Sequence, residues 1–150
     1  MASETSQAAE AAAELMKAMT RLRARLRTES APGEMPTTWS QITTLVRIVA
    51  EGPTTTTALA QAEYVRRQSM TETIAALRAN GLVTSEPHPD DGRKTLIKAT
   101  PRGQDLARTI PAAREAWLSS AIRTLLGPDE QQTLLKAAAM MNRIADTHLE

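Results

Sequence analysis

A cluster of polar side chains between residues 66 and 72 offers hydrogen-bond donors and acceptors within two helical turns. It combines two arginines with amide, hydroxyl and carboxylate groups. These types suit base edges and phosphate oxygens, because arginine pairs well with guanine, glutamine with adenine, and hydroxyls with phosphates. The members are Arg66, Arg67, Gln68, Ser69, Thr71 and Glu72. The alternative is an ordinary solvated start of a helix.

A second group of charges stands in the stretch HPDDGRKT, which is rich in turn-forming residues. On an extended chain Asp91 and Arg93 lie on the same side, so the carboxylate could hold the guanidinium in a bidentate pair. An arginine at the tip of a hairpin, followed here by Lys94, would fit the narrow and negative minor groove of DNA. The alternative is a surface ion pair of little consequence.

Residue types used in catalysis and metal binding are scarce. The chain has no cysteine and two histidines, His88 and His148, without the H-E-x-x-H spacing of a zinc site. Asp90 and Asp91 are adjacent, so on an extended chain they face opposite ways. We therefore expect no enzyme activity, no metal site and no cofactor.

Hydrophobic periodicity indicates the elements that position the two charged groups. Met70, Ile74 and Leu77 recur at i, i+4 and i+7, which predicts a helix over about 67–80 that ends at Gly81 as its C′ residue. The polar cluster lies off this apolar stripe. A short helix over about 58–63, capped by one of the preceding threonines, comes before it. Two short strands, 82–83 and 96–99, flank the polar turn.

Longer helical segments surround this central part. The pattern predicts a first helix over about 8–28 with frayed residues before it, and a second helix after a Thr37 or Thr38 cap. A fifth helix starts at Thr100-Pro101 and runs to about Leu126, with a kink expected near residues 107–111 because Pro111 cannot donate a backbone hydrogen bond. A sixth helix carries a seam of apolar positions: Leu134 or Leu135, Ala138, Met141, Ala145 and, at the tail, His148.

Composition limits the remaining possibilities. A length of 150 residues with 41% apolar content suits one domain, whose core must be aliphatic because phenylalanine is absent. The net charge of +1 gives by itself no argument for a nucleic-acid partner. The first residues show no basic and apolar leader pattern, so we expect a soluble cytoplasmic protein.

Together these elements predict a mainly α (α+β) fold with about six helices and one β-hairpin wing. Residues 1–150 would form a single domain, with a winged helix-turn-helix lobe over 37–102. Long helices over 8–30 and 103–150 would flank the lobe. Their apolar stripes are too extensive for the lobe to cover, so we expect them to pack together or against a second chain.

The chain resembles the MarR family of bacterial winged-helix regulators. The resemblance rests on the run VRRQSMTETIAALRANGLV, the wing run HPDDGRKTLIKATPRG and the long flanking helices, and it covers about residues 10–148. The family's wing pattern falls on Asp91, Arg93, Leu96, Ile97, Thr100 and Gly103. Gly92 stands where many relatives carry a second arginine, and Arg66 where serine or threonine often caps the recognition helix.

This resemblance implies a homodimeric, sequence-specific transcriptional regulator, most often a repressor, on a pseudo-palindromic operator in double-stranded DNA. The residues expected to contact DNA are Thr38, Thr55, Arg66, Arg67, Gln68, Ser69, Thr71, Glu72, Asp91, Arg93 and Lys94. The family further implies release from DNA by a small aromatic or phenolic ligand. By segment, Arg21, Met35 and Trp39 would line its pocket, and for Trp39 a place in the core is the favoured alternative.

Two other interpretations remain open. A PadR-like regulator would also bind DNA, but one long helix before the lobe and two after it favour MarR. A winged-helix module that dimerises and binds protein would leave Arg66, Arg67 and Arg93 dispensable.

Overall fold

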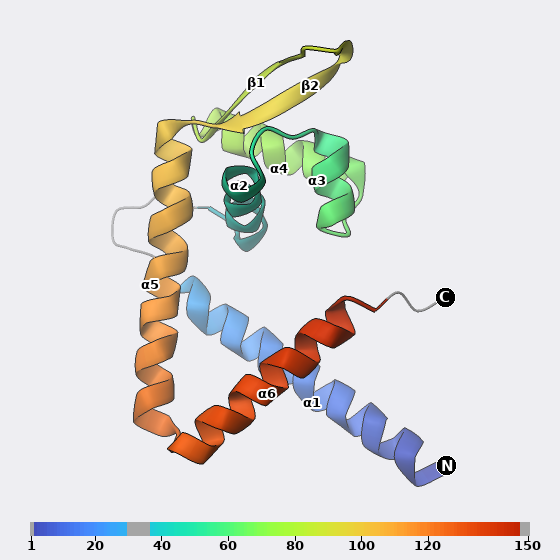
Figure 1. Cartoon of the computed structure of the whole chain (residues 1–150), viewed down its shortest axis with the longest axis vertical. Helices are drawn as coiled ribbons and strands as arrows, with labels where there is room; N and C mark the ends of the chain where they lie inside the picture. Colours follow the sequence, from blue (N-terminus) through green and yellow to red (C-terminus); the bar gives the residue numbers. More distant parts are fainter. Residues whose placement is uncertain (1, 30–36, 148–150) are drawn as a thin grey trace. The chain divides into compact units, whose positions relative to one another are not determined.

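The computed structural model describes residues 2–29 and 37–147. The elements are α1 Ala2–Arg27, α2 Trp39–Glu51, α3 Thr56–Ala62, α4 Arg67–Ala79, β1 Val83–His88, β2 Asp91–Ala99, α5 Pro101–Leu125 and α6 Pro128–Ala145 (Figure 1). Within the described residues this confirms the predicted six helices and one antiparallel hairpin. The chain divides into two compact units, before and after the peptide bond between Arg114 and Glu115.

The first helix begins earlier than the sequence predicts. Residues before Ala8 were expected to fray, yet α1 starts at Ala2. The segment ASETSQAAEAAAE is rich in alanine, glutamate and glutamine, which are strong helix formers, so local propensity supports the extra turns. The expectation failed because it took small polar residues at the start of the chain as a sign of fraying.

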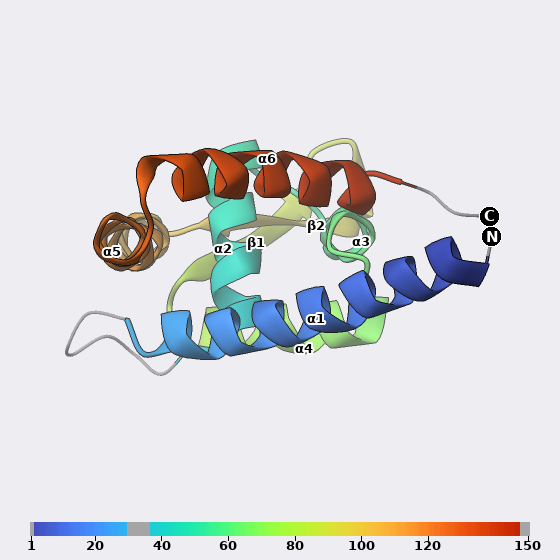
Figure 2. The ribbon, with the colours of Figure 1, turned by 90° about the horizontal axis from the view of Figure 1, so that it is seen from below.

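The winged lobe is built on an aliphatic core between α2, α3, α4 and the hairpin. Leu45 and Leu77 are completely buried, and the predicted stripe of α4 points into this core. Helices α2 and α4, which carry these two leucines, cross steeply, as Figures 1 and 2 show from two directions. The cluster consists of Leu45, Ile48, Leu59, Ala60, Met70, Ile74, Leu77, Leu82, Val83, Ile97 and Ala107. Burying one face of α4 in this way leaves its opposite face to solvent.

The end of α4 has the geometry that the glycine predicts. Gly81 adopts a φ of 69°, its N–H donates to the Arg78 carbonyl at 2.9 Å, and the Leu82 N–H donates to the Leu77 carbonyl at 2.9 Å. This pair of bonds is a Schellman motif, which needs a residue in the left-handed region. The chain therefore turns sharply from α4 into β1.

The start of α5 is joined to this turn. The Thr100 hydroxyl donates to the Gly81 carbonyl at 2.7 Å and accepts from the Gly103 N–H at 3.0 Å, so the predicted Thr100 cap is confirmed. The Thr100 N–H also donates to the Leu82 carbonyl at 3.0 Å. Gly103 is buried, and a methyl group on it would overlap the Leu82 carbonyl oxygen. Backbone therefore meets backbone where α5 leaves the lobe.

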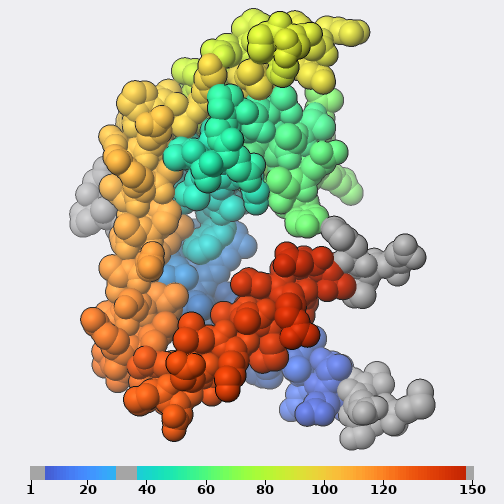
Figure 3. All heavy atoms as spheres, viewed as in Figure 1, coloured from blue at the N-terminus to red at the C-terminus, as the bar shows by residue number. Residues whose placement is uncertain are grey.

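The hairpin is longer than the apolar pattern indicates. Its strands pair from Val83 opposite Ala99 to His88 opposite Asp91, with an irregularity between Pro87 and His88. Only the base of the hairpin contacts the core, through Val83 and Ile97. The outer half is polar, so its sequence lacks the apolar pattern from which strands are predicted. The Thr54 and Ile97 backbones bond to each other and tie the hairpin to the loop before α3. The space-filling view shows the hairpin lying over the helices of the lobe (Figure 3).

The fifth helix was predicted with nearly the observed bounds, Pro101–Leu125. α5 continues through Pro111 without ending there. α6 begins after Gly127, whose N–H donates to the Glu130 carboxylate at 2.8 Å. None of the described residues of α6 is buried in this single chain. Met141 of the predicted seam is half-buried, and His148 lies outside the described residues. No described helix is both long and apolar enough to cross a membrane.

Candidate nucleic-acid interface

The first two turns of α4 present the polar cluster to solvent. Arg66 is the N-cap residue and its side chain makes no capping hydrogen bond, so the guanidinium is not used to start the helix. Thr71 donates its hydroxyl proton back to the Arg67 carbonyl at 2.9 Å. Arg66, Arg67, Gln68, Ser69, Thr71 and Glu72 are all exposed, while Met70 among them is buried. This face of α4 can therefore approach a groove of DNA without disturbing the core.

A polar groove of about 410 Å³ lies between α3, the start of α4 and the hairpin. It brings together four of the predicted residues: Thr55, Arg67, Arg93 and Lys94. Its lining contains three cationic side chains and no carboxylate, so it favours an anion such as a backbone phosphate. The full lining is Thr55, Thr56, Thr57, Ala58, Gln61, Arg67, His88, Arg93, Lys94 and Thr95.

Arg93 is held near the tip of the hairpin by Asp91, but not by the bidentate pair that the spacing suggested. One carboxylate oxygen, Oδ1, accepts from the Arg93 backbone N–H at 3.1 Å and from its Nε at 3.4 Å. The other oxygen lies 3.9 Å from the Lys94 Nζ. Using the backbone N–H leaves only one guanidinium nitrogen within reach of Asp91. The Arg93 side chain is 94% exposed, so its other donors stay available to a partner.

Thr38 does not line the cationic groove. Its hydroxyl accepts from the Gln41 N–H at 3.2 Å, and the Gln41 side chain accepts from the Thr38 N–H at 3.1 Å. This capping box starts α2, whose other end, at Gly52, is the one beside β2 and the hairpin. Thr38 therefore has a structural role that accounts for its hydroxyl. Thr55 also caps a helix, accepting from the Ala58 N–H at 3.2 Å, but it lines the groove.

Sequence reasoning missed several residues of the groove. His88 was assigned to a turn, whereas it ends β1, and its Nδ1 accepts from the Asp90 N–H at 3.1 Å. That bond leaves Nε2 as the ring nitrogen that can donate. Thr56, Thr57 and Gln61 belong to α3. From the sequence, this helix was interpreted only as one that supports α4. The run of four threonines at residues 54–57, where α3 starts, was the available signal, since hydroxyls at a helix start suit phosphate.

A second groove, of about 450 Å³, lies between α1 and the start of α2. Trp39 lines it half-buried, and the guanidinium carbons of Arg23 and Arg114 lie 5.4 Å and 4.5 Å from its ring centre. The alternative interpretation placed Trp39 in the core, but Trp39 is not part of the aliphatic core cluster. Arg21 is exposed and does not line this groove; its neighbour Arg23 does. Met35 lies outside the described residues. The remaining lining residues are Met16, Met19, Thr20, Leu22 and Leu26.

Comparison with known proteins connects this geometry to a family. The model of the MarR family matches residues 37–95, from the start of the lobe into β2 of the hairpin. An HTH-type transcriptional regulator of Mycobacterium leprae is 36% identical over 135 residues, covering 90% of this chain and 92% of that protein.

Solved structures agree in fold. A transcriptional regulator from Pseudomonas aeruginosa has a TM-score of 0.78 at 28% identity and covers 95% of this chain and 98% of that chain. The PcaV transcriptional regulator from Streptomyces coelicolor, solved in complex with its natural ligand, has a TM-score of 0.65 at 25% identity, covering 91% and 89% of the two chains. All three similar proteins are described as transcriptional regulators and none as an enzyme.

Proposed function

The chain belongs to the MarR family of winged helix-turn-helix transcriptional regulators, which bind DNA, and on that premise we propose that it is a homodimeric repressor. It would occupy a pseudo-palindromic operator in a promoter and leave it when a small aromatic ligand binds. Each half-site would receive α4 in the major groove and the hairpin in the adjacent minor groove.

The observation that carries this proposal is the groove shared by α3, α4 and the hairpin. Arg67 lines one concave surface together with Arg93 and Lys94, which are distant from it in sequence. No carboxylate is part of this lining, although Asp91 contacts both hairpin cations. The net charge of the chain is only +1, so this arrangement is a local concentration of positive charge. A surface of this kind would hold the DNA backbone while the exposed face of α4 reads the bases.

The homodimer is supported by apolar side chains that the single chain leaves exposed on the long helices. Met16 is 64% exposed on α1, Leu125 77% on α5, and Ile144 66% on α6. Several large apolar side chains are exposed on each of α1 and α6, as at a protein–protein interface, and a twofold partner would present the same surfaces. Two lobes related by a twofold axis would then require half-sites about one helical turn apart, roughly 10 base pairs.

Ligand-dependent release is supported by the groove at Trp39. It combines apolar side chains of α1 with an aromatic ring and the Arg23 guanidinium, which together suit an aromatic acid. PcaV, which shares the fold, was solved with a natural ligand. A ligand would lower DNA affinity if it bound better to the conformation that fits the operator poorly.

The decisive test is binding to DNA fragments from the upstream regions of the source genome at two salt concentrations, followed by footprinting of the tightest fragment. We expect an inverted repeat, and a Kd that rises steeply with salt. Replacing Arg93 by alanine should weaken binding about 5- to 150-fold. Arg108→Ala is the matched control, because it removes the same charge from α5, where the exposed guanidinium pairs with Asp105 and does not line the groove.

Equal weakening by both variants would attribute the effect to net charge and reject the role of the hairpin. Weak affinity for every fragment, unchanged by Arg93→Ala, would favour the protein-binding module instead. Light scattering should give twice the chain mass. Titration with a panel of hydroxybenzoates, followed by tryptophan fluorescence and by DNA release, tests the ligand; no response to any of them in either assay would reject this ligand class.

A further inference from the structure

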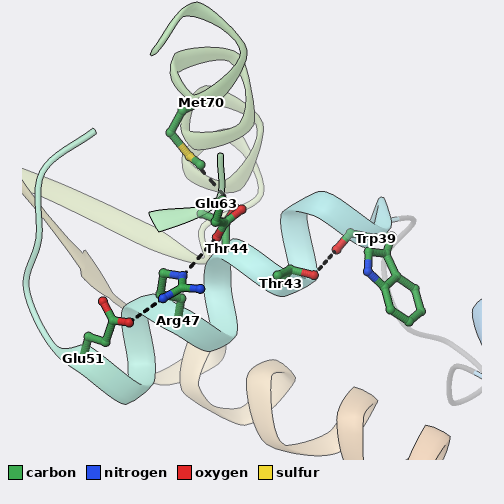
Figure 4. A network of polar contacts seen from close by, with 7 residues as sticks. All are labelled: Trp39, Thr43, Thr44, Arg47, Glu51, Glu63 and Met70. Atoms are coloured by element: carbon green, nitrogen blue, oxygen red, sulfur yellow. Dashed lines mark hydrogen bonds and ion pairs between the residues drawn. The ribbon is translucent and has the colours of Figure 1, made fainter. Parts of the chain in front are cut away.

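We propose that Glu63 is a positioning residue for DNA recognition: held by α2, its carboxylate sets the turn between α3 and α4, and with it the orientation of the DNA-facing start of α4. The inference rests on the proposed operator binding and assigns to it a buried residue that does not itself touch DNA. It concerns the network drawn in Figure 4.

Glu63 is the C-cap residue of α3, and its side chain is only 10% exposed. Oε2 accepts a hydrogen bond from the hydroxyl of Thr44, a fully buried residue of α2, at 2.9 Å. Oε1 lies 3.6 Å from the Nε of Arg47, one helical turn further along α2. The Arg47 Nη1 in turn lies 2.6 Å from Oε1 of Glu51. One face of α2 thus holds this carboxylate from two directions.

The network contacts both sides of the turn. The Thr44 hydroxyl, bonded to Glu63 before the turn, is also 4.0 Å from the sulfur of Met70, the first buried residue of α4. Between these two points Tyr64 adopts a φ of 54°, and the Val65 N–H donates to the Ala60 carbonyl at 3.0 Å. A non-glycine residue in the left-handed region persists only where its surroundings impose it. Thr44 and Glu63 are the polar side chains that provide such a constraint.

Stability alone explains this arrangement poorly. Placing charges in a protein interior costs free energy that their mutual attraction often fails to recover, so an apolar contact would serve the core as well or better. The geometry is also imperfect, because Arg47 Nε and Glu63 Oε1 have no hydrogen-bond partner among the described residues. A direct DNA contact is equally excluded, since the carboxylate is buried and negative. The hydrogen bond from Thr44 and the ion pair with Arg47 instead fix the position of the turn relative to α2.

The position of Glu63 affects DNA binding through Arg66 and Arg67, which follow it by three and four residues. Arg66 is the N-cap of α4, and Arg67 lines the cationic groove. A turn that is free to shift would let the start of α4 take several orientations, of which one fits the bases. Operator binding needs that orientation, whereas non-specific binding depends on charge alone. Loss of the attachment should therefore lower the preference for the operator more than it lowers affinity for any DNA.

The test compares the ratio of Kd for unrelated DNA to Kd for the operator in four variants of the full-length protein. Glu63→Gln removes the charge and keeps the shape, and Thr44→Val removes the hydroxyl with little change of volume. We expect either change to reduce the ratio about tenfold, as a weakened base contact does. Thr44→Ser keeps the hydroxyl and should stay within about threefold of the wild type. Glu51→Gln is the matched control, because Glu51 bonds the same arginine but is away from the turn.

Circular dichroism and denaturant titration at the binding temperature accompany each measurement, so that only folded protein is compared. A ratio unchanged in Glu63→Gln and Thr44→Val, whatever their stability, would overturn the inference. So would a loss in Thr44→Ser or Glu51→Gln as large as that in Thr44→Val. A wild-type protein without any operator preference would overturn the proposed function itself, an outcome distinct from the others.

Discussion

Replacing Gly103 by alanine tests the joint between the lobe and α5. Gly103 is buried in the first turn of α5, and a Cβ built there would overlap the carbonyl oxygen of Leu82 and lie 3.3 Å from a methyl of Leu45. The obstacle is backbone, which cannot swing aside as a long side chain would. The start of α5 must therefore move away from Leu82.

The net effect can be worked out from competing terms. Alanine gains at most about 1 kcal/mol over glycine in helix propensity. Forcing a methyl group into a filled site costs about 1–3 kcal/mol. Movement of α5 also weakens the two hydrogen bonds that Thr100 donates to Gly81 and Leu82, each worth about 1 kcal/mol. The packing loss outweighs the propensity gain, so we expect a decrease of about 1–4 kcal/mol in the free energy of unfolding.

Denaturant unfolding followed by circular dichroism measures this change, at one protein concentration because the stability of a dimer depends on it. Gly92→Ala is the control: Gly92 is exposed with open space around its Cβ position, and its change should lie within about 0.5 kcal/mol. A Gly103→Ala protein at least as stable as the wild type would refute the reasoning, since helix propensity would then outweigh the backbone contact.

Three further changes probe separate elements. Leu77→Ala empties a completely buried site of the core and should cost about 2–5 kcal/mol of stability by the same titration, whereas a loss under 1 kcal/mol would mean that the core collapses around it. Tyr64→Gly relieves a left-handed φ, a gain of about 1–2 kcal/mol, and loses about 0.5–1 kcal/mol in chain entropy, so stability should be equal or up to 1.5 kcal/mol higher. Arg67→Ala should reduce the slope of log affinity against log salt by about one, and an unchanged slope would remove Arg67 from the phosphate contacts.

The distribution of charge explains how a nearly neutral chain can serve as a DNA-binding protein. Lysines and arginines exceed acidic residues by one in the sequence, yet the groove at the hairpin has cations only. Asp91 contacts Arg93 and Lys94 but does not line the groove, where Arg67 adds a third cation. Local concentration of charge, which composition does not reveal, therefore sets the affinity expected for DNA.

Most helices could be predicted because their signals are local. The stripe of Met70, Ile74 and Leu77 predicted α4 within one residue, and Gly81 predicted its Schellman ending. The hairpin was underestimated because strand pairing beyond its base leaves no apolar pattern in the sequence. The start of α1 was misjudged because its small polar residues were taken as a sign of fraying, whereas alanine propensity extends the helix.

The residues of the site divide in the same way. The sequence by itself determined the elements, their order and the exposed polar face of α4, because periodicity, caps and turn residues act over a few positions. Only the tertiary structure decided that Thr55, Arg67 and Arg93 share one groove and that Thr38 does not. It alone revealed that the nearly buried side chain of Glu63 contacts α2 beside the turn before α4. Contacts between residues far apart in the chain depend on how the helices cross, and no local pattern encodes that geometry.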